Sequence, residues 1–290
     1  MSQKIKSNAK EVDLFLGKYI KRQKFTNLIY PMKYGTLSGG KKIRSTIIFN
    51  VAKILKLKKK EIINICAAVE CIHSYSLIHD DLPCMDNDIL RRGKASTHIK
   101  FGESTAILAG NSLLTLAFEL LTEKKYNINS NKKIILVKKL AEFSGHTGIA
   151  GGQYLDLSYE KKKISVSKII EMQKKKTGKL FEFCFLAPAI LAGLKINKIN
   201  SFGKIGEEVG LLFQIADDLL DLKGLKKNVG KSVNKDKRKG KSTLIKLLGY
   251  KKTKEFALKR KKAIINKLNK YGKKSQELIK TLNFILDRSY

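Results

Sequence analysis

The chain has 290 residues, and its 60 Lys and Arg against 25 Asp and Glu give a formal net charge of +35. Only three prolines occur and no proline-rich or serine-rich linker divides the chain, which favours long helices in a single domain, residues 1–290. The four cysteines form no CxxC pair and have no histidine at zinc-site spacing, which argues against a structural zinc site and favours reduced, buried thiols.

The apolar stretches indicate neither a secretory leader nor a membrane span. Residues 1–20 interleave Lys, Asn and Glu with apolar residues and lack the apolar core of a signal peptide. The longest apolar stretches, 106–121 and 180–194, contain polar residues and are shorter than the roughly 20 residues that a span needs. We therefore expect interior helices and a cytoplasmic protein.

The excess of positive charge raises the question of a nucleic-acid partner. The lysines are spread along most of the chain, and the aromatic residues, 8% of the sequence, form no stacking pattern with them. This distribution is typical of lysines on solvated helix faces, and it makes a nucleic-acid-binding protein the weaker alternative. A basic surface would still attract a polyanionic substrate.

Apolar residues recur at helical spacing almost throughout the chain. In 61–79 and in 205–222 they follow a rhythm of three and four residues. No long segment alternates with period two, and no hairpin signal lies between β-branched runs. Glycine-rich joints at 38–40 and 145–152 separate helical segments, and the highly charged 223–241 is expected to be a mobile loop. The pattern predicts an all-α fold, a bundle whose central helices are apolar on nearly all sides.

Aspartates gather in two short patches of this basic chain. The first patch contains Asp80, Asp81 and Asp86. Pro83 disfavours helix at Leu82, so we expect the preceding helix to end near Asp81. Carboxylates at a helix C-terminus meet the negative end of the helix dipole, which costs stability. Because Mg²⁺ prefers oxygen ligands and shares them with phosphates, the patch predicts a magnesium site.

The second patch lies on the helix expected over 205–222. Asp217 and Asp221 are four residues apart and share one face, with Gln214 three residues earlier on that face and Asp218 beside it. Two aspartates at this spacing repel each other unless a cation bridges them. A solvated acidic turn is the alternative that these residues alone leave open.

Basic residues near the first patch favour a diphosphate as the ligand that the metal shares. Lys41 and Arg44 follow the glycines of 38–40, where exposed backbone amides and cations form a generic phosphate cradle. Arg91 and Arg92 follow the first patch closely in the sequence.

His73 is expected on the same helix as the first patch. It precedes Asp80 by seven residues, which is two turns and about 10 Å along roughly the same face. A lone histidine on an apolar helix is more often a core residue with satisfied hydrogen bonds. Two interpretations therefore stay open, a core histidine and a diphosphate contact.

The ordered set of motifs resembles the trans-isoprenyl diphosphate synthase family over residues 30–249. Each motif alone is weak, but their order along one chain is specific. The matching segments are Gly39-Gly40-Lys41 with Arg44, 70–83, Asp86, Arg91-Arg92-Gly93 with His98, Gly151-Gly152-Gln153 with Asp156, Lys176-Thr177-Gly178, Phe213-Gln214 before Asp217-Asp218, Lys231, and 240–243. The resemblance implies an isoprenoid synthase fold of about ten core helices around a deep central cavity. It also implies acidic patches that face each other across the cavity mouth, and a homodimer.

The resemblance implies roles for individual residues. The metal ligands would be Asp80 and Asp86 for two Mg²⁺ ions and Asp217 for a third. The further catalytic carboxylates would be Asp81, Asp218 and Asp221. The residues that bind the allylic diphosphate would be Arg91, Lys176, Lys231 and Lys241. Those that bind isopentenyl diphosphate would be Lys41, Arg44, His73 and Arg92. The catalytic residues beside the allylic carbon, next to Lys176, would be Thr177 and Gln214.

These parts imply prenyl transfer by ionisation, condensation and elimination. Mg²⁺ neutralises the departing diphosphate, the allylic cation forms in a dry cavity, and the double bond of isopentenyl diphosphate attacks it. Loss of a proton gives a product one C5 unit longer. The implied reaction extends dimethylallyl or geranyl diphosphate to the C15 product farnesyl diphosphate.

Side chains just before the first patch are expected to set the product length. Tyr75 lies five residues before Asp80, where an aromatic ring would block a growing chain, and Ser76 beside it is small. In the family, an aromatic at this place and two extra residues within 80–86 resemble the bacterial C15 synthases. The alternatives are a Tyr75 that only packs the core and a longer-chain enzyme that makes geranylgeranyl diphosphate.

Two other classes remain as alternatives, a terpene cyclase and a non-catalytic partner subunit. A cyclase would replace the second patch with an Asn/Ser/Glu motif, and a partner subunit would lack aspartates of one patch, whereas both patches are complete here. Some residues depart from the family pattern without removing a predicted ligand: Ser45 for a proline, Asn87 and Ile89 within an acidic run, Asn111 for an aspartate, and Leu225 for an acidic residue.

Overall fold

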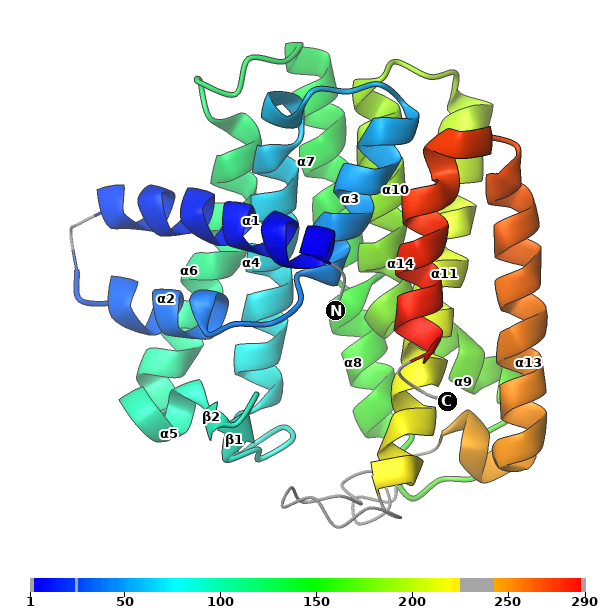
Figure 1. Cartoon of the computed structure of the whole chain (residues 1–290). Coiled ribbons are helices and arrows are strands. Elements are labelled where there is room, and N and C mark those ends of the chain that lie inside the picture. The colour runs from blue at the N-terminus through cyan, green and yellow to red at the C-terminus, as the bar shows by residue number, and fades with distance from the viewer. Residues whose placement is uncertain (1–2, 24–25, 225–242, 288–290) are drawn as a thin grey trace. The chain divides into compact units, whose positions relative to one another are not determined.

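The computed structural model describes residues 3–23, 26–224 and 243–287, and the all-α class is confirmed (Figure 1). The α-helices in these ranges are α1 (Gln3–Arg22), α2 (Ile29–Leu37), α3 (Ile43–Ile54), α4 (Ile63–Asp80), α5 (Thr97–Phe101), α6 (Glu103–Thr122), α7 (Ser130–Ser144), α8 (Ile149–Ser158), α9 (Val166–Gln173), α10 (Lys179–Leu191), α11 (Ile196–Gly224), α13 (Leu244–Asn269) and α14 (Gln276–Asp287). The short elements are η1 (Lys59–Glu61), η2 (Lys174–Gly178), η3 (Gly272–Ser275), β1 (Leu90–Arg91) and β2 (Lys94–Ala95).

The chain divides into two compact units. Unit 1 comprises Met1–Ala52 and Lys56–Val137, and unit 2 comprises Lys53–Leu55 and Lys138–Tyr290. That the whole chain acts as one domain stays a prediction.

The helix at the centre of unit 1 is α4, which packs against α1, α2 and α6. It corresponds to the helix expected over 61–79, and its residues from Ile65 to Ile72 are all buried, as predicted for a central helix. It ends at Asp80 with Asp81 as C-cap, because Pro83 disfavours helical backbone at the residue before it. The position of the first patch at a helix C-terminus is thus confirmed.

A small hairpin after α4 was not expected from the sequence. β1 pairs antiparallel with β2, and the two-residue turn between them has positive φ at Arg92 (54°) and Gly93 (76°). Positive φ at both turn residues matches the twist of hairpin strands. The strands are only two residues long and contain no β-branched run, so no period-two pattern predicts them. Figure 1 shows the hairpin close to the C-terminal end of α4.

In unit 2, α10 packs along α11, and α13 and α14 also pack against α11 (Figure 1). The helix expected over 205–222 is the second half of α11, which begins earlier because Ile199 and Phe202 continue the same apolar rhythm. Nearly every side chain of α10 is buried. The segment 166–191 is one continuous helix in which η2 forms a π-helical turn between α9 and α10.

The apolar helix α6 is buried on one side only. It exposes Ile107 (41%) and Leu108 (55%), and 44% of its most apolar window is buried. In the described part of the chain, α6 is the one helix long and apolar enough to cross a membrane, criteria that a core helix also meets. The prediction of an interior helix is therefore wrong for one face of α6. Composition alone does not tell whether an apolar face packs against its own chain.

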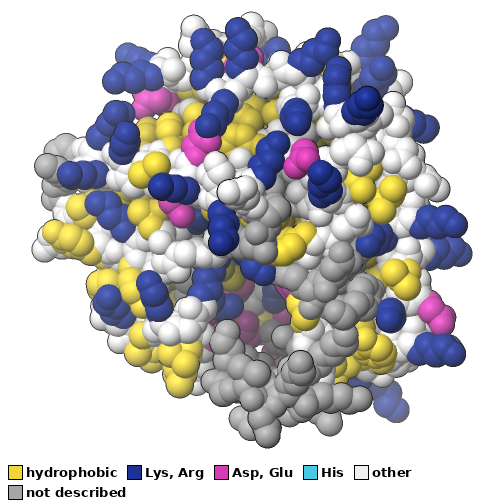
Figure 2. Space-filling view, in the orientation of Figure 1, with side chains coloured by type: hydrophobic (Ala, Val, Ile, Leu, Met, Phe, Trp, Pro, Cys, Tyr) yellow, Lys and Arg dark blue, Asp and Glu magenta, His cyan; other side chains and the backbone are white. Residues whose placement is uncertain are grey.

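Lysine and arginine side chains are scattered over the face of the molecule that Figure 2 shows, on both units, with a few acidic residues among them. They form no continuous stripe on that face, in agreement with the even spread of lysine along the sequence.

Candidate active site

The loop after α4 folds back so that the two ends of the first patch lie together. The backbone N–H of Asp86 donates to the carbonyl of Asp80 (2.8 Å), and that of Asp88 donates to the carbonyl of Asp81 (3.1 Å). Asp80 and Asp86 are partly exposed, whereas Asp81 is buried. Two predicted metal ligands thus meet at one helix end.

The third aspartate of the patch is engaged by an arginine. Arg91 Nε donates to Oδ1 (2.9 Å) and Oδ2 (3.2 Å) of Asp81, its Nη2 also donates to Oδ1, and Nη2 lies 3.4 Å from Asp88. Burial raises the pKa of Asp81, and the Arg91 guanidinium opposes this rise. Asp81 therefore orients Arg91, a role that the sequence did not separate from metal binding.

Arg92 holds the glycine loop between α2 and α3. Its Nη1 donates to the carbonyl of Gly39, and a Cβ at Gly40 would lie 2.7 Å from the Arg92 guanidinium. Gly40 also has a φ of 110°, which only glycine adopts without strain. The structure thus brings the predicted phosphate cradle together with Arg92, which follows Gly39 by 53 residues in the chain.

His73 on α4 lies within electrostatic reach of this basic cluster. Its pKa lies well below the usual 6.5, because burial disfavours the imidazolium and the charges of Arg44 and Arg92 repel it. The ring is therefore neutral at pH 7, with one N–H donor and one acceptor nitrogen. Arg44 and Arg92, which the resemblance assigns to the same diphosphate, are near enough to shape the charge state of His73, and both interpretations of this histidine stay open.

The basic residues of the glycine loop differ in exposure. Lys41 and Arg44 are partly exposed, whereas Lys42 is buried. Lys42 Nζ donates to the carbonyl of Thr36 (2.6 Å) and lies 3.4 Å from Asp13. Lys42 thus anchors the loop to the core, and Lys41 and Arg44 are the basic residues of the loop that solvent reaches.

Tyr75, the predicted chain-length residue, packs edge-on against His79. The two ring centroids are 5.3 Å apart at an interplanar angle of 86°. His79 Nε2 lies 3.1 Å from the carbonyl of Ile107 on α6, within hydrogen-bond distance. The Tyr75 ring is therefore fixed by a contact between α4 and α6 one turn before the first patch.

In unit 2, hydrogen bonds link the second patch to η2. Thr177 Oγ1 donates to Gln214 Oε1 (2.9 Å), and Gln214 Nε2 donates to Asp218 Oδ1 (2.9 Å). Gln173 Nε2 donates to the other oxygen of Asp218 (3.0 Å). Asp218 is buried, so it orients the two glutamines, while Asp217 is partly exposed. Thr177 and Gln214, both expected beside the allylic carbon, are thus in direct contact with each other.

The π-helical turn η2 presents Lys176 and Thr177 side by side. A Cβ at Gly152 would lie 2.1 Å from the backbone nitrogen of Lys176, so only glycine lets α8 come this close to η2. Lys176 Nζ donates to Asp156 Oδ2 (2.6 Å), one turn later on α8. No pattern in the sequence predicts a π-turn here, although such turns are frequent at functional sites.

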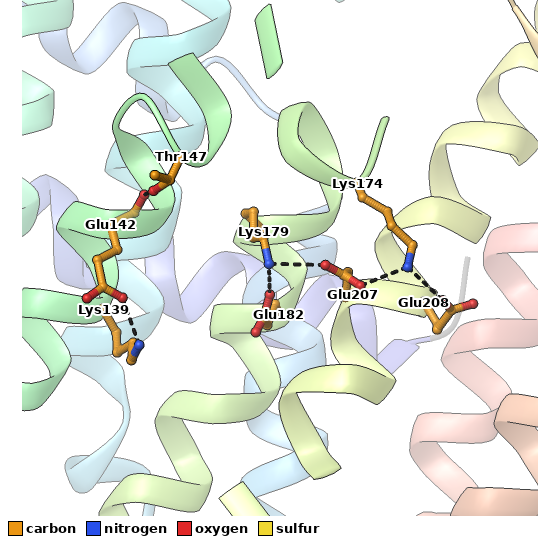
Figure 3. A network of polar contacts seen from close by, with 8 residues as sticks. All are labelled: Lys139, Glu142, Thr147, Lys174, Lys179, Glu182, Glu207 and Glu208. Carbon is orange, nitrogen blue, oxygen red and sulfur yellow. Dashed lines mark hydrogen bonds and ion pairs between the residues drawn. The ribbon is translucent and has the colours of Figure 1, made fainter. Parts of the chain in front are cut away.

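Ion pairs fasten η2 to α11, as Figure 3 shows. Lys174 contacts Glu207 (2.9 Å) and Glu208 (3.2 Å), and Lys179 contacts Glu207 (3.0 Å) and Glu182 (2.7 Å). Lys174 is the first residue of η2 and Lys179 directly follows the turn, so their ion pairs with Glu207 hold both ends of the turn. Burial alone would raise the pKa of Glu207, but the hydrogen bonds from Lys174 and Lys179 outweigh it and lower the pKa.

We expect Glu207→Gln to make the protein less sensitive to acid. A carboxylate with a lowered pKa contributes stability above its unfolded pKa, and this stability is lost as the pH falls through the folded value. The loss in the unsubstituted chain should amount to about 1 kcal/mol below pH 4.5, because the pair is partly solvated. Urea unfolding at pH 3.5, 5 and 7 measures it, and identical pH dependence in both proteins would contradict the assignment.

Some predicted residues cannot be placed. Lys231 and Lys241 lie outside the described residues, as does most of the loop predicted over 223–241, and the side chain of Asp221 is not described. The first patch belongs to unit 1 and the second to unit 2, so their meeting across one cavity stays a prediction. Among the described residues, no group of three or more His, Cys, Asp or Glu could hold a metal ion.

The model of one protein family, polyprenyl synthetase, matches residues 26–282 of the chain. The chain belongs to this family. The match includes both aspartate patches and every described residue with a predicted role.

Individual relatives narrow the comparison within the polyprenyl synthetase family. The farnesyl diphosphate synthase of Bacillus subtilis is 40% identical, covering 82% of each chain. Geranylgeranyl pyrophosphate synthase 4 of Arabidopsis thaliana is 38% identical, covering 98% of this chain and 77% of its own. Among solved structures, an FPP/GFPP synthase from Zymomonas mobilis has a TM-score of 0.86 at 32% identity, covering 98% of this chain and 100% of that chain. These likenesses agree with the isoprenoid synthase fold expected from the motifs.

One departure from the polyprenyl synthetase pattern is compensated within this chain. Ser45, which replaces the expected proline, donates through its N–H (3.2 Å) and its hydroxyl (2.8 Å) to Glu70 Oε1. A proline could not donate the first of these bonds. Glu70 is buried and lies 3.9 Å from Lys42, so it ties the start of α3 to α4. Glu70 lies in the matching segment 70–83, but the resemblance implied no role for it.

A groove of about 610 Å³ opens in unit 2, away from the residues with predicted roles. It is lined by Lys174, Glu207, Glu208 and Arg260 and by the apolar Phe256, among others. None of its lining residues was predicted as a site residue. Its polar wall belongs to the ion pairs that fasten η2.

Proposed function

We propose that this polyprenyl synthetase is a farnesyl diphosphate synthase, which condenses isopentenyl diphosphate with dimethylallyl or geranyl diphosphate. The carrying observation is the family match over 26–282, which retains both aspartate patches and the basic residues around them. The similarity to the Bacillus subtilis farnesyl diphosphate synthase supports the C15 product.

We assign the basic cluster of unit 1 to isopentenyl diphosphate. Lys41 and Arg44 supply exposed positive charge, and Arg92 adds a guanidinium held against the glycine loop. Neutral His73 donates one N–H without adding a charge that its arginine neighbours would repel. These groups hold the nucleophilic double bond in place by its diphosphate, which lowers the entropic part of the barrier.

The donor set of the aspartate patches fits Mg²⁺. Asp80 and Asp86 offer hard carboxylate oxygens brought together by the Asp86 to Asp80 backbone hydrogen bond, and Asp217 offers another on α11. Mg²⁺ is usually held by one or two carboxylates together with substrate phosphates, so no larger protein cluster is required. We infer three Mg²⁺ ions, which when bound would neutralise negative charge on the allylic diphosphate.

The residues of η2 and α11 act on the allylic substrate in this proposal. Lys176 and Arg91 hold its diphosphate by charge-assisted hydrogen bonds. The Thr177 hydroxyl donates its hydrogen bond to Gln214 Oε1, so the lone pairs of the Thr177 oxygen stay available to a developing cation. Fixed dipoles of this kind stabilise charge without reorganising during the reaction. Apolar side chains around them exclude water from the cation.

Condensation of geranyl and isopentenyl diphosphates in the presence of Mg²⁺ tests the proposal. We expect a C15 product by chromatography of material labelled from isopentenyl diphosphate, and no product after chelation of Mg²⁺. A dominant C20 product would instead favour a geranylgeranyl diphosphate synthase, the alternative that the Arabidopsis thaliana relative supports. Absence of any elongated product would refute both.

We also propose that the protein is a cytoplasmic homodimer that associates through the exposed apolar face of α6. In a chain with 60 Lys and Arg, α6 contains neither, and its exposed face carries Ile107 and Leu108. α6 also exposes Glu103 and Glu119, but an exposed apolar surface free of Lys and Arg in so basic a chain favours a permanent interface, since the hydrophobic effect favours covering it. A second copy of the chain would offer the same surface, as two-fold symmetry requires.

Leu108→Lys is expected to convert a dimer to a monomer, because it places a charge in the apolar contact. Sedimentation or light scattering measures the mass. Leu14→Lys on α1 is the matched control, since Leu14 and Leu108 are both 55% exposed. Equal masses for the two variants would exclude α6 as the interface.

A further inference from the structure

Gln153 on α8 is a buried amide without a hydrogen-bond partner. Its side chain is 7% exposed, and neither Nε2 nor Oε1 has a partner among the residues that the structure describes. Buried polar groups are nearly always hydrogen-bonded, and leaving one unpaired costs stability. A leucine or methionine of similar volume would avoid that cost. The amide is therefore more consistent with a ligand than with packing.

The position of Gln153 places it beside η2. Its neighbour Gly152 lies directly against the backbone of Lys176, and Asp156, one turn later on α8, accepts from Lys176 Nζ. Gln153 therefore lies on α8 directly beside the close contact between Gly152 and η2, the turn that carries Lys176 and Thr177. Oε1 of Gln173 is a second buried acceptor without a partner among the described residues. Gln173 is the last residue of α9 and immediately precedes η2.

The side-chain amide of Gln214 on α11 differs from that of Gln153, because both its oxygen and its nitrogen have hydrogen-bond partners. Its Oε1 accepts from Thr177 and its Nε2 donates to Asp218. Gln214 is therefore held in one orientation by the chain, whereas the amide of Gln153 keeps both its donor and its acceptor for something else. A dipole with both ends available can complement a species in which positive and negative charge separate.

We propose that Gln153 is a further catalytic residue, whose amide spans the ion pair formed when the allylic substrate ionises. The allylic C–O bond breaks and its electron pair stays on the diphosphate oxygen, so no proton or additional reactant is needed. Oε1 faces the carbon that becomes positive, and Nε2 donates to the departing diphosphate that Lys176 holds. Preorganised dipoles aimed at developing charge are among the largest contributions to catalysis. The inference rests on the prenyltransferase function proposed above.

Gln153→Leu tests the inference, because leucine keeps the volume and removes both polar ends. We expect kcat to fall on the order of 100-fold, the KM for geranyl diphosphate to change little, and Tm to stay equal or rise. The single-turnover rate of geranyl diphosphate ionisation, measured with an unreactive analogue of isopentenyl diphosphate, should fall by the same factor. A purely structural residue would not slow ionisation while stability is kept.

Asn8→Leu is the matched control. Asn8 on α1 is also buried, and its Nδ2 has no partner among the described residues, but it has no role in the proposed site. We expect its Tm to behave like that of Gln153→Leu and its kcat to stay unchanged. If Gln153→Leu does not fold, the unbranched Gln153→Met repeats the measurement.

The outcomes separate this inference from the function on which it rests. An unsubstituted protein that makes no elongated product refutes the function. An active protein whose folded Gln153→Leu or Gln153→Met variant keeps kcat within twofold refutes the role of Gln153 alone. A fall in Tm in both variants, with kcat falling in parallel, assigns Gln153 to the fold and also overturns the inference.

Discussion

Asp80→Ala is expected to lower kcat on the order of 1,000-fold or more while leaving the protein folded. Asp80 is the last residue of α4, where its carboxylate faces the negative end of the helix dipole. Its removal relieves that repulsion, so the free energy of unfolding should change by less than about 1 kcal/mol. The loss of activity would then come from weaker Mg²⁺ binding and from poorer neutralisation of the diphosphate. Steady-state kinetics across Mg²⁺ concentrations measure the loss of activity. Urea unfolding measures the change in the free energy of unfolding.

Asp217→Ala on α11 should reduce kcat comparably, because we assign it to a separate ion. Glu171→Ala is the control, since Glu171 is an exposed carboxylate of α9 whose contact is a surface ion pair with Lys175 (3.0 Å). Exposed pairs contribute little to stability, so this variant should match the unsubstituted protein in both measurements. Full activity in either aspartate variant would be incompatible with the proposed metal ligands.

Tyr75→Ala is expected to shift the main product from C15 to C20. The Tyr75 ring is held edge-on against His79, which in turn contacts α6, so the ring cannot swing aside easily. Truncation to alanine would open space for one more C5 unit, at a cost of about 2 kcal/mol in stability for a partly exposed aromatic. Chromatography of the products from geranyl and labelled isopentenyl diphosphates measures the shift. An unchanged C15 product would mean that Tyr75 only packs the core.

Ser76→Phe provides the opposite change at the neighbouring position. Ser76 is small, and its hydroxyl donates to the carbonyl of His73 (3.0 Å) within α4. A phenylalanine there would add a second aromatic near the end of the product chain and should increase the share of C10 product. If both substitutions left product length unchanged, the floor of the pocket would lie elsewhere.

The helices that carry the site were predictable because their signals are local. Pro83 and the apolar rhythm of 61–79 were enough to place the end of α4 at the first patch. The glycines of 38–40 and the cations after them predicted only a generic phosphate cradle, and the family resemblance added Arg92 and His73 to it. The family resemblance placed Thr177 and Gln214 at one substrate carbon, and the structure adds the hydrogen bond of 2.9 Å between them.

Features that depend on tertiary contacts could not be predicted from local pattern. The inward turn of Lys42, the Ser45 to Glu70 bonds and the engagement of Asp81 by Arg91 each need a partner that is distant in the sequence. Nothing in the residue types separates Lys41 from Lys42, because both are lysines after a glycine pair. The same holds for α6, whose apolar composition fits both a buried helix and a surface covered by another molecule.

The π-helical turn η2 makes the active-site segment sensitive to a change of length as well as of composition. A π-turn is an α-helix with one residue inserted, so deleting one residue within Lys174–Gly178 would let 166–190 run as a regular helix. Because a π-turn takes up its extra residue within its own widened turn, the residues of α10 would keep roughly their present faces after the deletion. The change would fall on η2 itself, where Lys176 and Thr177 would lose the backbone geometry in which the widened turn presents them. The number of residues in η2 would thus be under selection, independently of which side chains the turn carries.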